Sequence, residues 1–98
     1  MNIKKMMRQA QEAQDKILEQ IQAIEVTGTA GGGMVTAVLT GNNELKSIQI
    51  NPEVVNPQDV EMLQDLILAA VSEAHGKAEE KRKDIMSSAM GGLNIPGL

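Results

Sequence analysis

Two groups of basic residues have types and spacing that suit phosphate binding. Lys4 and Arg8 lie four positions apart, so on a helix they share one face, and Lys5 flanks them. A second group near the other end of the chain consists of Lys77, Lys81, Arg82 and Lys83. Side chains placed in this way contact successive phosphates without reading bases. The alternative is an ordinary solvated helix surface, particularly for the second group, in which three acids are interleaved.

The distribution of charge places these groups at the two ends of the chain. The 98 residues include 9 basic and 13 acidic ones, for a formal net charge of -4 at pH 7. Residues 1–10 hold three basic residues and no acid, whereas residues 11–76 hold ten acids against two lysines. Because the location of charge decides where a polyanion docks, any polyanion would contact the two ends of the chain and not its acidic middle.

A glycine-rich segment suggests nucleotide binding only at first sight. Gly28 and Gly33 have the spacing of a phosphate-binding loop, but Met34 and Val35 stand where that motif needs lysine and serine or threonine. The segment also leads into a predicted strand, whereas a phosphate cradle needs the N-terminus of a helix. We therefore interpret it as a connection between strands.

Metal binding and catalysis have even less support. His75 is the sole histidine and there is no cysteine, so a zinc site would depend on carboxylate ligands, which is uncommon. No Ser–His–acid or Cys–His grouping is visible, and the carboxylates fall at polar-face spacing. We predict no catalytic residue, no metal, no cofactor and no small-molecule substrate, and hence no enzyme.

Composition limits the core and the partners. The chain has no Trp, Tyr or Phe, so its core must be aliphatic, and a stable monomer of this size is doubtful. The missing aromatics also argue against a protein that stacks unpaired bases. Its longest apolar run, Leu66 to Val71, is far too short to cross a membrane, and no secretory signal is visible. The prediction is a soluble cytoplasmic protein.

Helical patterns at both ends enclose the glycine-rich segment. From Asn2 to about Glu25, apolar residues recur at alternating spacings of four and three, which predicts an amphipathic helix with a heptad stripe. The stripe consists of Ile3, Met7, Ala10, Ile17, Ile21 and Ile24, with Gln14 in the remaining step. Such a narrow stripe is typical of a helix that pairs with another helix.

The middle of the chain, residues 26–51, predicts a small antiparallel β-meander. Val26 and Thr27 favour a strand, and Gly28 and Gly31 to Gly33 are expected to form a loop. Two further strands, Met34–Thr40 and Glu44–Ile50, would be joined by a turn at residues 41–43, whose glycine and asparagines tolerate positive φ.

The second helix is expected over residues 57–90, with Asn56 as its N-cap and Pro57 at its first position. Its predicted buried stripe consists of Val60, Leu63, Ile67, Ala70, Val71 and Ala74. Residues 75–84 offer little to bury and should stand in solvent, and residues 91–98 should form a loose tail. Helices of about 36 Å and 50 Å exceed a compact domain of this size, so they must project, pair with a second chain, or both.

Four motifs in order carry a family resemblance. They are V-T-G-x-x-G-G-G-x-V (residues 26–35), G-x-x-x-L-x-x-I-x-I-x-P (41–52), D-x-E-x-L-x-D-L-I-x-A-A (59–70) and G-L-x-x-P-G (92–97). Together they resemble the YbaB/EbfC family of bacterial nucleoid-associated proteins over nearly the whole chain. The resemblance implies a single α+β domain over residues 1–98, of order α-β-β-β-α. It also implies a homodimer whose sheets meet at the interface and whose long helices project.

The resemblance likewise implies double-stranded DNA as the partner and a cytoplasmic protein associated with the nucleoid. Such a protein would bind DNA with little sequence preference, contribute to nucleoid organisation and take part in gene regulation. The expected DNA contacts are the seven basic residues of the two groups. The alternative is a dimeric adaptor whose arms grip another protein. Its seven methionines would supply an adaptable surface, although filling an aromatic-free core is the simpler role for them.

Overall fold

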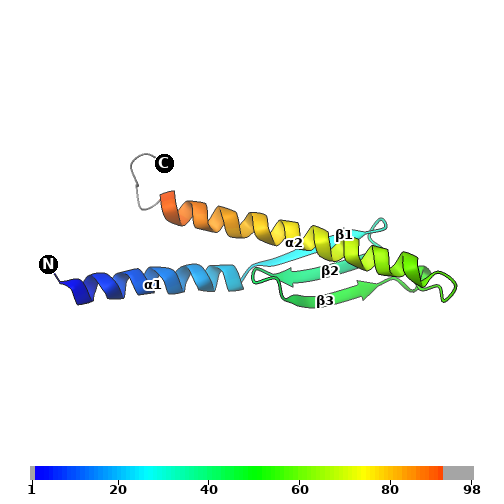
Figure 1. The fold of residues 1–98 in the computed structure, drawn as a ribbon, viewed down its shortest axis with the longest axis horizontal. Coiled ribbons are helices and arrows are strands. Elements are labelled where there is room, and N and C mark those ends of the chain that lie inside the picture. Colours follow the sequence, from blue (N-terminus) through cyan, green and yellow to red (C-terminus); the bar gives the residue numbers. More distant parts are fainter. Residues whose placement is uncertain (1, 92–98) are drawn as a thin grey trace.

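The computed structural model describes residues 2–91, apart from the side chain of Met90 (Figure 1). Its elements are α1 (Ile3–Gln22), β1 (Glu25–Ala30), β2 (Val35–Thr40), β3 (Leu45–Ile50), a short 3-10 helix (Pro52–Val54) and α2 (Val60–Gly91). The predicted α+β class and its α-β-β-β-α order are confirmed. Residues 92–98, the greater part of the predicted tail, lie outside the described residues.

Helix α1 is capped by a residue just outside it. The Asn2 side chain accepts a hydrogen bond from the Lys5 backbone N–H at 3.1 Å, which satisfies one free donor of the first turn. The helix ends at Gln22, earlier than predicted, because Glu25 already pairs with Thr40 in the sheet. Ile24 is therefore buried in the core beyond the helix rather than within the helical stripe.

The three strands form one antiparallel sheet in the order β1-β2-β3. Ala30 pairs with Val35, and the connection between them runs through Gly31, Gly32 and Gly33, all at positive φ. Glycine reaches this backbone region without steric cost, which explains the glycine run as a tight turn. Asn43, with φ 63°, closes the turn between β2 and β3 where a turn was predicted.

Gly28 lies inside β1 and not in a loop, which corrects the sequence prediction. A Cβ atom built on Gly28 would meet the Ala70 carbonyl oxygen at 2.2 Å and the Ala74 nitrogen at 2.4 Å. The position therefore needs glycine because the α2 backbone crosses the strand there, not because the chain must turn.

Helix α2 begins at Val60, three residues after the predicted start. The Asn56 side chain accepts from the Gln58 N–H at 3.0 Å, and the Asp59 N–H donates to the Asn56 carbonyl at 2.9 Å, so Asn56 caps a turn. The Asp59 side chain accepts from the Met62 N–H at 3.2 Å, which is the N-cap contact. Asn56 and Asp59 are both residue types that cap turns and helices. Their spacing in the sequence did not show which of the two caps the helix.

The core lies between α2 and the strands β1 and β2. Ala70, Ala74 and Ala78 are fully buried along one side of α2, and they meet Val26, Val35, Ala37 and Leu39 from the sheet. The prediction that residues 75–84 stand in solvent is wrong at Ala78, which is fully buried and continues the alanine line by one more step of four. Small side chains on the helix and Gly28 on the strand permit this close approach.

The molecule is elongated. Its extents are 70 × 26 × 16 Å and its radius of gyration is 19.2 Å, against about 13 Å for a compact chain of 100 residues. Helix α1 and the C-terminal half of α2 both extend beyond the same end of the sheet (Figure 1). The expectation of projecting helices is therefore confirmed.

Candidate nucleic-acid interface

The N-terminal end of α1 carries three basic residues and no acid in its first turn. Lys4, Lys5 and Arg8 are all exposed, and the first turn contains no acidic residue. The partial positive charge of a helix N-terminus adds to these cations. Exposed Ile3 and Met7 lie among them, so this end of α1 presents cations to solvent on an arm that packs little apolar surface.

Lys77 on α2 is engaged with the protein itself. Its ammonium group donates to the Thr27 carbonyl of the edge strand β1 at 2.9 Å and lies 3.2 Å from the Glu73 carboxylate, one helical turn away. The side chain remains about half exposed, at 52%. A cation held between an acid and a backbone carbonyl offers less charge to an external phosphate than a free one.

Arg82 is held within the protein more strongly than Lys77. It is half-buried, and its guanidinium donates to the Gly41 carbonyl and, at 3.1 Å, to Asn43 Oδ1. These bonds join α2 to the turn between β2 and β3. Hydrogen bonds from a charged donor are among the stronger ones in proteins. The first function of Arg82 is therefore to fix the helix on the sheet.

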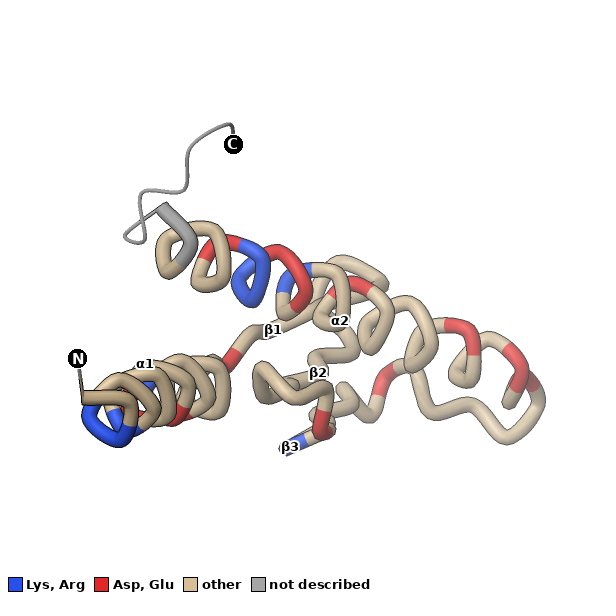
Figure 2. Tube along the Cα trace, turned by 60° about the vertical axis from the view of Figure 1, so that its left-hand side comes forward, with Lys and Arg blue, Asp and Glu red and all other residues tan. Residues whose placement is uncertain are grey.

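Lys81 and Lys83 are exposed, but acids surround them. Lys81 lines a shallow groove beside β1 together with Glu25, Glu80 and Asp84. In Figure 2 the basic and acidic segments alternate along this part of α2, while blue segments gather at the outer end of α1. The structure thus separates the predicted site into a basic cluster at the start of α1 (Lys4, Lys5 and Arg8) and a mixed-charge one on α2.

The described residues offer no alternative site of the kinds considered above. His75 is exposed, and within residues 2–91 no group of three or more His, Cys, Asp or Glu side chains is placed to hold a metal ion. Gly28 of the phosphate-loop spacing is buried against α2. Among the described helices, none combines the length and the apolar character needed to cross a membrane.

Sequence reasoning missed the internal roles of Lys77 and Arg82. A signal was present: Ala70, Ala74 and Ala78 continue at the same spacing to Arg82, so the arginine occupies the buried side of α2. The turn that it reaches, Gly41 to Asn43, offers a backbone carbonyl and a side-chain amide oxygen as acceptors. Nothing in the spacing, however, indicated that this turn lies beside that step of the helix.

Comparisons with known proteins agree with this architecture. The sequence model of the YbaB/EbfC DNA-binding family matches residues 1–93. A protein of Thermoanaerobacter pseudethanolicus named as nucleoid-associated is 52% identical, over 99% of this chain and 90% of its own length. One from Clostridium acetobutylicum with the same description is 49% identical, over 99% of this chain and 89% of its own.

A solved structure shares the fold. The crystal structure of an uncharacterized protein from Helicobacter pylori superimposes with a TM-score of 0.73 at 22% identity, covering 92% of this chain and 98% of that one. That likeness concerns the fold alone. Family membership follows from the match to the family model and from relatives that are about 50% identical in sequence. The chain belongs to the YbaB/EbfC DNA-binding family.

Proposed function

We propose that this protein is a nucleoid-associated DNA-binding protein that contacts duplex phosphates with little sequence preference. The description of its family and the names of its relatives support DNA as the partner and the nucleoid as the location within the cytoplasm. The family is not described as an enzyme family. In this proposal the protein helps to organise the nucleoid, and it affects gene regulation through the places on DNA where it binds.

The observation that carries the mechanism is the basic cluster at the start of α1. Lys4, Lys5 and Arg8 stand exposed at the positive end of a helix dipole, on an arm that projects from the sheet. Phosphate contacts of this kind fix a protein on the duplex but carry no sequence information. The acidic middle of the chain repels the duplex and confines contact to the arms.

The basic residues of α2 contribute unequally in this proposal. Lys81 and Lys83 are exposed and add phosphate contacts, weakened by the acids between them. Lys77 and Arg82 belong to the same basic group, but their hydrogen bonds to Thr27 and Gly41 make them chiefly supports of the arm. Two chains would pair through the sheets and parts of the helices, so that a homodimer presents two sets of arms to one duplex.

Salt dependence of binding tests the mechanism. Fluorescence anisotropy of a short labelled duplex, titrated at several salt concentrations, gives the slope of log K against log salt. With roughly five phosphates neutralised by each chain, the slope should be about -4.5 for each bound chain, and unrelated duplex sequences should bind about equally. Protein concentration is taken from peptide-bond absorbance because the chain has no aromatic residue.

Matched variants compare the α1 cluster with basic charge elsewhere in the chain. Replacing Lys4, Lys5 and Arg8 with alanine should reduce the slope by about three for each bound chain and weaken all sequences alike. Replacing Lys46, which lies on β3 in the sheet and outside the arms, should leave the slope nearly unchanged. A loss confined to one sequence would exclude phosphate-only recognition. Absence of binding at low salt would favour the protein adaptor instead.

A further inference from the structure

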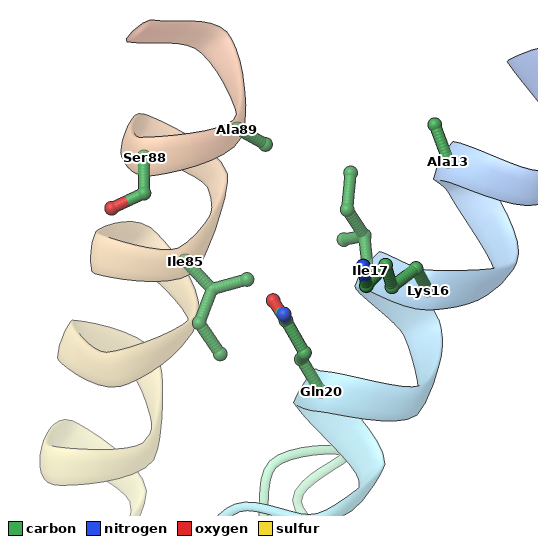
Figure 3. A pocket seen from close by; sticks show the side chains of 7 residues that line it. All are labelled: Ala13, Lys16, Ile17, Gln20, Ile85, Ser88 and Ala89. Atoms are coloured by element: carbon green, nitrogen blue, oxygen red, sulfur yellow. The ribbon is translucent and has the colours of Figure 1, made fainter. Parts of the chain in front are cut away.

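A cleft of about 470 Å³ lies between the two projecting arms. Ala13 and Ile17 line its α1 wall, and Ile85 and Ala89 line its α2 wall. Figure 3 shows the Ile17 and Ile85 side chains pointing toward one another across the space, with Ala13 and Ala89 nearer the ends of the arms. The helices diverge toward those ends (Figure 1), so the cleft is narrow at the isoleucines and open where the two alanines face it.

The outer part of α1 carries exposed apolar side chains. Ile21 is buried and Ile17 is half-buried, so the inner part of the apolar stripe packs within the chain. Ile3 and Met7 continue the same stripe outward, yet they are 68% and 67% exposed. Apolar residues at alternating spacings of four and three are typical of a helix that packs along another helix. Within residues 2–91, the outer part of α1 therefore lacks the partner that its pattern predicts.

We propose that this partner is α1 of a second copy of the chain, and that each α1 enters the cleft of the other copy. The two helices run antiparallel, because each one enters with its N-terminal end first. Ile3 of one copy then lies between Ile17 and Ile85 of the other, in the narrow part of the cleft.

The spacing of the residues fits this arrangement. Ile3 and Met7 are four residues apart. The isoleucine and the alanine on each wall of the cleft are also four residues apart, about 6 Å along a helix. When Ile3 lies between the two isoleucines, Met7 therefore lies between the two alanines. Its long, flexible side chain fills the space that the alanines leave open.

The same register makes the pair symmetric. With Ile3 opposite Ile17, Ala10 of one α1 lies opposite Ala10 of the other, because Ala10 is midway between these two positions. A small residue at the crossing point lets the two helices approach closely. Both clefts are filled at once, so this contact closes on itself and joins two chains only.

Charge favours the antiparallel pair. Residues 3–8 of α1 hold three basic residues and no acid, whereas residues 11–20 hold three acids and one lysine. Antiparallel pairing lays each basic end beside the acidic part of the other helix, and it also opposes the two helix dipoles. A parallel pair would bring the two basic ends together. Duplex DNA does not suit the cleft, since its charged phosphates would enter a space lined mainly by apolar side chains.

The contact leaves part of the basic cluster on α1 free for DNA. At 3.6 residues per turn, Lys5 and Arg8 lie on the side of α1 away from Ile3 and Met7. Two molecules joined at their arms would therefore each keep cations facing outward. The inference itself stands without DNA binding and without pairing through the sheets.

An engineered cysteine at the crossing point tests the proposal, because the natural chain has none. In the full chain, Ala10→Cys should form a disulfide between two copies, since the two sulfur atoms meet at the symmetry axis. The control is Gln9→Cys, an exposed position in the same turn that points roughly 100° away around the helix. In a glutathione redox buffer, Ala10→Cys should cross-link about tenfold more readily than Gln9→Cys, because only the former pair has disulfide geometry.

Two results of this experiment would overturn the proposal. Equal cross-linking of both variants would mean that the arms collide without a preferred register. No cross-link in either variant would mean that the α1 arms of two copies do not meet.

A second measurement removes the apolar contact without a cysteine. Ile3→Gln combined with Met7→Gln should weaken association between chains about tenfold, whereas Leu68→Gln, at a position of α2 that is 65% exposed, should leave it unchanged. All samples also carry Val38→Lys, which places a charge on the open face of the sheet and so suppresses pairing there. Sedimentation equilibrium over a range of protein concentrations gives the association constants.

A Val38→Lys protein that sediments as a single chain at every concentration would overturn the proposal. Equal weakening by the Leu68→Gln variant would overturn it too. Neither result bears on pairing through the sheets, which the change at Val38 removes from all samples, so failure of one association is distinguishable from failure of the other.

Discussion

At the residue scale, the contacts within reach decide what a side chain does. Lys4 and Lys77 are chemically identical, yet Lys4 is an exposed cation on the α1 arm, and Lys77 joins Glu73 to the carbonyl of Thr27. The contrast between glycines is equally sharp. Gly28 touches the α2 backbone, whereas nothing lies within 4 Å of a Cβ built on Gly76 in the same helix–sheet unit.

Adding one methyl group at these two glycines should have opposite effects on stability. Gly28→Ala forces a Cβ into the Ala70 carbonyl and the Ala74 nitrogen, so we expect a loss of about 3 kcal/mol, the upper end of overpacking costs. Gly76→Ala meets open space within α2 and should gain up to about 1 kcal/mol from helix propensity. Urea unfolding followed by circular dichroism measures both. A Gly28→Ala variant as stable as the parent would refute the close packing.

At the element scale, what was predictable from sequence depended on local periodicity. The helices, the hairpin turn and the glycine-rich connection follow from patterns within a few residues of one another. The role of Gly28 and the burial of Ala78 follow instead from residues more than 40 positions apart that meet only in the folded chain. The alanine line along α2 was visible in the sequence, but the surface that it packs against was not.

Arg82 and Lys83 are neighbours that should separate stability from DNA binding. Arg82→Ala removes the bonds from α2 to Gly41 and Asn43, which should cost about 1.5–3 kcal/mol of unfolding free energy, since hydrogen bonds to charged groups contribute at this level. Lys83→Ala leaves stability nearly unchanged but should reduce the salt slope by about one if Lys83 contacts a phosphate. Urea unfolding and salt-dependent anisotropy are measured on both. Equal effects of the two variants on the salt slope would show that Arg82 binds DNA as Lys83 does.

At the scale of the whole molecule, a small aliphatic core supports two long arms. Helix α2 covers one face of the sheet, and the opposite face carries Thr36, Val38 and Thr40 from β2, which alternate with the buried residues and are themselves half-buried. Exposed Leu45 and Leu68 add apolar surface elsewhere. A chain of this size buries a modest share of its surface, so pairing would add stability that one chain lacks.

The homodimer is the last prediction, and it concerns both stability and affinity. Sedimentation equilibrium should give twice the chain mass, and Val38→Lys, which puts a charge in the centre of the open sheet face, should shift the mass toward one chain. Gln58→Lys adds the same charge in the exposed turn before α2 and should leave the dimer intact.

Because two linked sets of arms bind one duplex with an effective concentration near the millimolar range, the Val38→Lys variant should also lose at least tenfold in DNA affinity while keeping Lys4, Lys5 and Arg8. If the unaltered protein sediments as a single chain and binds DNA as tightly as the Val38→Lys variant does, the dimer prediction is wrong. One pair of arms is then sufficient for DNA binding.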